Sequence, residues 1–288
     1  MTRALEIVGA GFARGQKKSG VELALAHLLA IGLADHVPPG TRVMRLDDDP
    51  RRTPQPGQYL GQLARHLGEG ALTTGLSGLP LVIGGDHTIV CATMSATLRR
   101  HPDCGLLWFD AHADFNNVDT SITGNLHGMP VHGLVYGSRT FGGLPEFDWL
   151  GQGLLRPERI AMIGLRDVDP EEQVLLDRAG ILRVDMAAVN LEGMASAVSR
   201  CIDHLGRDRP LHVSVDLDSL DPGVFPATGC LAPGGLTFDQ LLAGVQLALQ
   251  QANVCAMDLV EYNPALDDDE ATCGHRVLAL IDGLVAAL

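Results

Sequence analysis

The segment that decides the fold is Gly105-Leu106-Leu107-Trp108-Phe109-Asp110-Ala111-His112-Ala113-Asp114. Its first half is a short apolar run typical of a buried strand, and its second half alternates acidic residues and histidine with alanine. Comparable runs recur at residues 5–8, 79–83, 159–163, 181–184, 211–215 and 254–259. Most of them are followed by Gly or Asp and then by a helical pattern. This alternation predicts a parallel sheet.

Leu and Ala at helical spacing fill the intervening segments, at residues 21–33, 58–72, 88–100, 171–179, 191–205, 237–251 and 271–287. We therefore expect an α/β fold of three layers, α/β/α, with a mostly parallel sheet. Residues 47–57 and 136–156 are rich in Pro, Gly or Arg, but no shift of composition flanks them. We expect both to be surface loops of a single domain, residues 1–288.

The composition indicates which classes of partner are unfavourable and which compartment suits the chain. With 21 Lys+Arg against 35 Asp+Glu, the formal net charge of -14 argues against nucleic acid or an anionic membrane as partner. The six cysteines stand singly, without a CxxC pair, which favours a reducing compartment. The first nine residues lack the apolar stretch of a signal peptide, and no run approaches membrane-spanning length. We expect a soluble, cytoplasmic protein.

Polar residues follow four of the predicted strands. His87 ends Gly84-Gly85-Asp86-His87, Asp110 follows residues 107–109, Asp216 follows residues 213–215, and Glu261 follows residues 258–260. Open α/β sheets bind ligands at the carboxyl edge of their strands. We therefore expect these side chains to meet at that edge.

The spacing of these residues predicts two metal ions. In an extended chain Asp110, His112 and Asp114 would point the same way, as would Asp216 and Asp218. If the two strands are neighbours, Asp110 and Asp216 can each bridge two ions. His87 and Asp114 would then complete the coordination of one ion, and His112 and Asp218 that of the other. The predicted ligands are His87, Asp110, His112, Asp114, Asp216 and Asp218. Carboxylates with one histidine per ion favour two Mn²⁺ per chain over structural zinc.

Such a centre predicts hydrolysis. Two ions about 3.5–4 Å apart would lower the pKa of a shared water and yield a hydroxide that attacks a planar carbon. Each motif alone also occurs as a turn or a helix cap. Three of them together, each at the end of a strand, favour the metal centre.

The chain resembles arginases, members of the ureohydrolase family, at an ordered series of motifs. They lie at residues 9–22, 84–89, 110–116, 124–130, 164–170, 214–222, 226–229, 234–237 and 258–264. The resemblance implies a manganese pair that attacks a guanidino carbon and releases urea or a relative of it. It further implies that Asp114 orients the hydroxide, that Glu261 holds the guanidinium and that His127 carries a proton to the leaving amine. A homotrimer or homohexamer is the assembly it suggests.

The arginase pattern also implies how the amino-acid end of the substrate is held. Asn116, with Asn125 nearby, matches the position that contacts the carboxylate, Asp169 the one that holds the α-ammonium, and Glu172 lies behind it through water. Asp169 has an alternative role as the cap of a helix that begins at Pro170.

Two positions depart from that pattern. Thr123 replaces a usual Ser, and Cys230 replaces a usual Thr close to where the guanidino group should bind. A substrate with an added hydroxyl would need room or a partner there. Cys230 therefore suggests Nω-hydroxy-L-arginine, whose hydrolysis releases hydroxyurea for antibiotic biosynthesis.

The sequence thus predicts a dimanganese amidinohydrolase that converts L-arginine or Nω-hydroxy-L-arginine to L-ornithine and urea or hydroxyurea. One alternative is an agmatinase or another guanidino-acid ureohydrolase. A second is a noncatalytic, metal-stabilised regulatory subunit, although such a scaffold would need neither Glu261 nor His127. A third, the related deacetylase fold with one zinc, would leave His87, Asp114 and Asp218 surplus.

Overall fold

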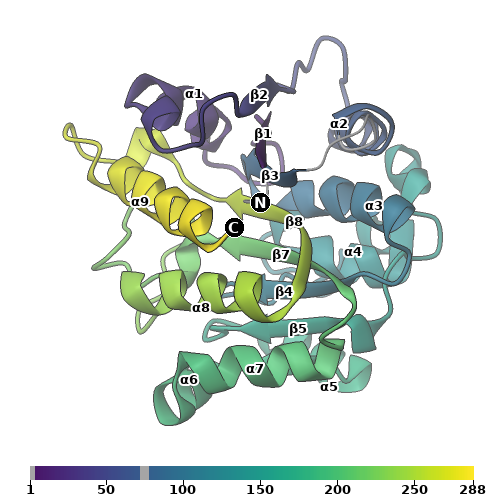
Figure 1. The fold of residues 1–288 in the computed structure, drawn as a ribbon. Helices are drawn as coiled ribbons and strands as arrows, with labels where there is room; N and C mark the ends of the chain where they lie inside the picture. Colours follow the sequence, from purple (N-terminus) through teal and green to yellow (C-terminus); the bar gives the residue numbers. More distant parts are fainter. Residues whose placement is uncertain (1–3, 72–77) are drawn as a thin grey trace.

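The computed structural model describes residues 4–71 and 78–288, and within them the strands form one eight-stranded sheet (Figure 1). The order is β2-β1-β3-β8-β7-β4-β5-β6, and all neighbouring strands are parallel. The strands are β1 Leu5–Ala10, β2 Arg42–Arg45, β3 Leu79–Gly84, β4 Gly105–Phe109, β5 Ile160–Ile163, β6 Leu182–Val184, β7 Pro210–Asp216 and β8 Asn253–Val260. The predicted parallel sheet is confirmed.

Helices cover both faces of the sheet (Figure 1). They are α1 Ala24–Ala30, α2 Pro56–His66, α3 Val90–Arg100, α4 Pro130–Tyr136, α5 Pro170–Ala179, α6 Met186–Glu192, α7 Met194–Leu205, α8 Phe238–Gln251 and α9 Thr272–Ala287. One face packs its apolar side chains against α1, α6, α7, α8 and α9, and the other against α2, α3, α4 and α5. Because successive side chains of a strand point to opposite faces, Leu107 and Phe109 join the first core and Leu106 and Trp108 the second. The three-layer α/β/α fold class is confirmed.

Several predicted boundaries were wrong. The helix expected over residues 191–205 is two helices, α6 and α7, because Gly193 between them has a positive φ of 80°. The helix expected over residues 21–33 starts as a 3-10 turn at Val21–Leu23, and α1 ends before Gly32, which lies in the left-handed region. The predicted end of the helix 58–72 lies outside the described residues. Strand β2 was missed because its side chains are largely exposed.

The segment 136–156 is not a plain surface loop. It contains 3-10 turns at Gly137–Phe141 and Pro145–Leu150, and it follows α4, which the sequence did not predict. Phe141, Phe147 and Leu150 are buried, and the two phenylalanine rings stack with centroids 4.0 Å apart. The segment therefore packs into the apolar core that α2 and α3 form on this face of the sheet. None of the helices within residues 4–71 and 78–288 is long and apolar enough to cross a membrane.

Candidate metal centre

The predicted ligands and Glu261 lie at one edge of the sheet, at the ends of four strands that stand side by side in the order β3-β8-β7-β4. His87 begins the turn after β3, Glu261 follows β8, Asp216 ends β7, and Asp110 follows β4. Parallel strands present their carboxyl ends at the same edge, so the sheet itself gathers residues that are far apart in the sequence. The structure therefore brings these residues together at the expected edge, and their roles as metal ligands stay a prediction.

Five of the six predicted ligands form two clusters that share Asp110, and the sixth, Asp216, lies against His87. The Nδ1 atom of His87 lies 3.0 Å from Asp216 Oδ2, 3.1 Å from Asp110 Oδ2 and 3.6 Å from Asp114 Oδ2. The ligand atoms of His87, Asp110 and Asp114 lie within 4.8 Å of one another, as do those of Asp110, His112 and Asp218. His112 Nδ1 lies 3.1 Å from Asp218 Oδ2 and 3.4 Å from Asp110 Oδ1.

The turns that carry these ligands are bent rather than extended. The backbone N–H of His112 donates to Asp110 Oδ1 at 2.7 Å, and that of Asp218 donates to Asp216 Oδ1 at 2.7 Å. Asp114 has φ 48° and Glu261 has φ 66°, a left-handed conformation that non-glycine residues rarely adopt. The expectation of one extended row from Asp110 to Asp114 was therefore wrong. The residues meet because the chain folds back over the sheet edge.

The donor set fits a divalent cation. His87 Nδ1 and Asp110 Oδ2 are buried without a hydrogen-bond partner among the described residues, although they face each other. Burial and the neighbouring Asp218 raise the pKa of Asp216 well above its usual range, and burial and Asp110 do the same for Asp114. Carboxylates crowded in this way need a cation between them. Oxygen and imidazole donors without a thiolate suit Mn²⁺.

Glu261 is buried behind this centre, and its carboxylate interacts with three neighbouring residues. Its Oε1 accepts a 2.9 Å hydrogen bond from the backbone N–H of His87 and lies 3.2 Å from His127 Nδ1, and its Oε2 accepts from Gln16 Nε2 at 2.7 Å. Burial would raise the pKa of Glu261, but hydrogen bonds from His127, His87 and Gln16 lower it. Glu261 therefore stays an anion. Sequence reasoning assigned Gln16 no role; its position in the loop after β1, at the same sheet edge, was the available signal.

His127 lies where the centre opens to solvent. Burial lowers its pKa, but hydrogen bonds with Cys230 and Glu261 outweigh burial and raise the pKa well above the usual value. The ring is 15% exposed, so it can exchange a proton with a molecule bound in front of it. This combination suits a group that holds a proton and then gives it up.

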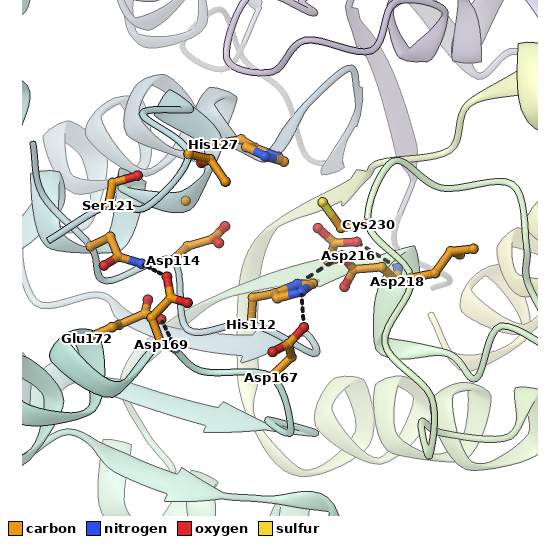
Figure 2. A pocket seen from close by; sticks show the side chains of 14 residues that line it. His112, Asp114, Ser121, His127, Asp167, Asp169, Glu172, Asp216, Asp218 and Cys230 are labelled. Carbon is orange, nitrogen blue, oxygen red and sulfur yellow. Dashed lines mark hydrogen bonds and ion pairs between the residues drawn. The ribbon is translucent and has the colours of Figure 1, made fainter.

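A cavity of about 360 Å³ opens in front of the ligands (Figure 2). Figure 2 shows His112, Asp216 and Asp218 on one side of it and Ser121, Asp169 and Glu172 on the other. The predicted residues that line it are His112, Asp114, Asn116, Thr123, His127, Asp169, Glu172, Asp216, Asp218 and Cys230. Ser121, Asp167 and Leu231 also line it, and the sequence did not single them out. Asn125 is not part of this wall among the described residues.

The far wall is a preformed acidic corner. Asp169 and Glu172 form a capping box at the start of α5, and Asn116 Nδ2 donates to Asp169 Oδ2 at 3.2 Å. Glu172 accepts from the backbone N–H of Phe115 at 2.6 Å, and burial raises its pKa to about 7. Asp169 is therefore a helix cap and a cavity residue at once. Glu172 Oε2 accepts a hydrogen bond directly from the backbone N–H of Asp169, at 3.3 Å.

Comparisons with known proteins agree with this geometry. Residues 4–281 match the model of the Arginase family. The chain is 38% identical to an arginase of Eremothecium gossypii, over 90% of this chain and 69% of that protein, and 33% identical to Arginase-1 of Homo sapiens, over 92% and 86%. The crystal structure of arginase from Bacillus subtilis superposes with a TM-score of 0.86 at 26% identity, covering 98% of both chains. The cold-adapted arginase of Glaciozyma antarctica gives 0.74 at 30% identity, covering 98% and 94%. The chain belongs to the arginase family of hydrolases, as the motifs of its sequence predicted.

Proposed function

We propose that this chain is a dimanganese amidinohydrolase that acts on the guanidino group of L-arginine or of its Nω-hydroxy derivative. The observation that carries the proposal is the shape of the site: two ligand clusters that share Asp110 face an acidic corner, Asp169 and Glu172, across one cavity. A guanidinium could lie at the ligand clusters while the amino-acid end of the same molecule reaches the corner. The relatives reported above are arginases by name, which supports the same substrate class.

His87, Asp110, His112, Asp114, Asp216 and Asp218 would hold the two Mn²⁺ ions. Bound there, the ions would supply an activated water for attack on the guanidino carbon. Asp114, which lines the cavity, would orient that water. The conformation of Asp114, with φ 48°, turns its carboxylate toward His87.

Glu261 would stabilise positive charge at the site, and His127 would donate a proton to the leaving amine. Glu261 Oε1 lies 3.2 Å from Nδ1 of His127 and holds a proton on that atom, which favours the imidazolium. His127 lines the cavity and can pass a proton to the departing amine. The negative charge of Glu261 also favours a cationic guanidinium nearby.

Asn116, Thr123, Asp169 and Glu172, which line the cavity, would select an amino acid over a simple amine. Asn125 would act through Thr123, whose Oγ1 accepts from its backbone N–H. Asp169 offers a carboxylate to an α-ammonium, and Asn116 and Thr123 offer hydrogen-bond donors to a carboxylate. Agmatine, which lacks the carboxylate, would leave those donors without a partner. If agmatine were hydrolysed with a kcat/KM above that of L-arginine, this assignment would be wrong and the agmatinase alternative correct.

Cys230 favours the hydroxylated substrate as a second candidate. Its side chain lines the cavity and is hydrogen-bonded to His127, next to the ligand cluster. A thiol is a weaker hydrogen-bond partner than the usual threonine hydroxyl, and its environment could admit an added hydroxyl on the substrate. Release of hydroxyurea for antibiotic biosynthesis is the role that this substrate would imply.

The deciding experiment is product analysis with the Mn²⁺-loaded protein on L-arginine and Nω-hydroxy-L-arginine side by side. A higher kcat/KM for the hydroxylated substrate, with hydroxyurea as product, supports the second candidate, and a higher value for L-arginine excludes it. No turnover of either would contradict the proposal and favour the regulatory subunit. The homotrimer or homohexamer and the cytoplasmic location stay predictions.

A further inference from the structure

A row of polar side chains lies buried beneath His87, inside the sheet. Trp108 of β4, Ser214 of β7 and Asp258 of β8 stand opposite one another in register, on the face that α3 covers. His212 lies on the same strand face as Ser214, two residues earlier, and Thr93 reaches in from α3. Each of these side chains is at most 2% exposed. None of them belongs to either ligand cluster.

Asp258 is the acceptor at the centre of this row. Its Oδ2 accepts from Thr93 Oγ1 at 2.8 Å, from His212 Nε2 at 2.8 Å and from Ser214 Oγ at 3.3 Å. A carboxylate can only accept hydrogen bonds, so in its contact with Asp258 the Ser214 hydroxyl is the donor, while the other oxygen of Asp258, Oδ1, is buried without a hydrogen-bond partner among the described residues. The hydrogen of the Ser214 hydroxyl therefore points at Asp258.

The direction of that bond determines where His87 carries its hydrogen. Ser214 Oγ lies 2.9 Å from His87 Nε2. Because its only hydrogen is used on Asp258, Ser214 can serve His87 only as an acceptor, so Nε2 must be the protonated nitrogen. Nδ1, which lies among the three carboxylates, is then the nitrogen whose lone pair a metal ion would use.

One further contact fixes the orientation of the His87 ring, and another fixes its backbone. The ring stacks on Trp108 with centroids 3.8 Å apart and planes 5° from parallel. The backbone N–H of His87 donates to Glu261. With its plane held by Trp108 and its edge by Ser214, the ring cannot rotate without breaking a buried contact.

We infer that Ser214 and Asp258, backed by His212 and Thr93, are positioning residues that hold His87 in the Nε2-protonated form, with Nδ1 directed at one metal ion. The inference rests on the proposed metal centre. A metal-binding histidine commonly donates its other N–H to such a partner, and loss of the partner typically weakens metal binding about 10- to 100-fold. Among the described residues, the hydrogen bonds of Ser214 and Asp258 reach one predicted ligand side chain, His87, so the effect should fall mainly on one of the two ions.

The test is a two-site titration of the purified protein with Mn²⁺, which needs no substrate. In Ser214→Ala the acceptor for His87 Nε2 is lost, and we expect one ion to bind roughly 10- to 100-fold more weakly while the other stays within about 3-fold of the parent protein. Ser95→Ala removes another buried serine hydroxyl, on α3 and outside this network, and is the matched control; both ions should bind as in the parent. The ¹⁵N chemical shifts of His87 in the metal-free protein should also report Nε2 protonation in the parent and its loss in Ser214→Ala.

The outcomes separate the inference from the proposed function. Unchanged affinity for both ions in folded Ser214→Ala overturns the inference, and an equal loss of both ions shows a merely structural role and overturns it too. If Ser214→Ala does not fold, Ser214→Cys, which keeps a side chain there but offers only a weak acceptor, decides by the same criteria. A parent protein that binds no Mn²⁺ would refute the proposed metal centre instead. A parent that binds two ions without hydrolysing guanidino compounds would refute the proposed activity alone.

Discussion

Asp169 offers the sharpest test of substrate recognition, because its two roles can be separated by substitution. It caps α5, and it presents a carboxylate to the cavity that also accepts from Asn116. Asparagine is as good a helix cap as aspartate, whereas alanine costs about 1 kcal/mol of stability at such a position. Asp169→Asn therefore removes the charge and keeps the cap, and Asp169→Ala removes both.

The expected magnitude follows from the contacts. A hydrogen bond between the α-ammonium and a carboxylate contributes about 1.5–3 kcal/mol, which corresponds to roughly 10- to 100-fold in kcat/KM. In Asp169→Asn a single amide oxygen would have to serve the helix cap, Asn116 and the substrate, so we expect a loss of about 10-fold on the amino-acid substrate. In Asp169→Ala the loss should approach 100-fold, with an unfolding midpoint lower by a few degrees.

The assay compares L-arginine with 5-guanidinopentanoate, which keeps the guanidino group and carboxylate but lacks the α-ammonium. If Nω-hydroxy-L-arginine proves the better substrate, it replaces L-arginine in the assay. For 5-guanidinopentanoate, Asp169→Asn should leave kcat/KM unchanged or raise it, because the carboxylate of Asp169 repels that of the ligand. An equal loss on both substrates would refute the assignment of Asp169 to the α-ammonium.

Three further predictions concern the site and the fold around it. Glu261→Gln should lower kcat/KM by about 100-fold, because His127 loses its charged partner, while two Mn²⁺ still bind; activity above half that of the parent would contradict this. Gly85→Ala should lower the unfolding midpoint by several degrees in thermal denaturation, since a Cβ there would overlap the carbonyl oxygen of Phe12; an unchanged midpoint would be inconsistent with the packing. Burial lowers the pKa of His132 to about 4, so its stabilising effect is complete above its unfolded pKa of about 6.5 and is lost as the pH falls through 4. Urea unfolding at pH 7 and 4.5 should therefore show that His132→Asn loses about 2 kcal/mol less on acidification than the parent, and an equal loss would disprove the role.

The sheet could be predicted because its strands are buried on both faces. Runs such as Leu107-Trp108-Phe109 are apolar throughout, as expected for a parallel strand that is covered on both faces. The edge strand β2 lacks that signature, since one of its sides is free and its arginines remain exposed. The segment after α4 was misjudged for a related reason: its glycines indicate turns, but Phe141 and Phe147 pack into the core from within those turns.

The ligands could be predicted because each one directly follows such a run. Their mutual geometry could not, because it depends on turns with a left-handed residue at Asp114, a conformation that aspartate adopts more readily than most residues but that its sequence position does not specify. Gln16 was missed because its partner Glu261 is 245 residues away. Ser214 and Asp258 did leave a signal, a serine and an aspartate inside strands that are largely apolar. A buried strand tolerates such residues only if they bond to each other, and that pairing requires the strand order.

Different parts of this fold determine the reaction and the choice of substrate. The predicted ligands are held by turns that sit on central strands, and Asp110 and Asp216 are at most 2% exposed. Ser121 and Thr123 instead lie in a loop held by its own hydrogen bonds, such as Gly124 N–H to Ser121 Oγ at 3.0 Å and Asn125 N–H to Thr123 Oγ1 at 3.1 Å. Substitutions in that loop leave the ligand clusters untouched, so we expect them to change KM and the preferred substrate more than kcat. Cys230 is the exception: it lines the same cavity but contacts His127, so a substitution there should change selectivity and proton transfer together.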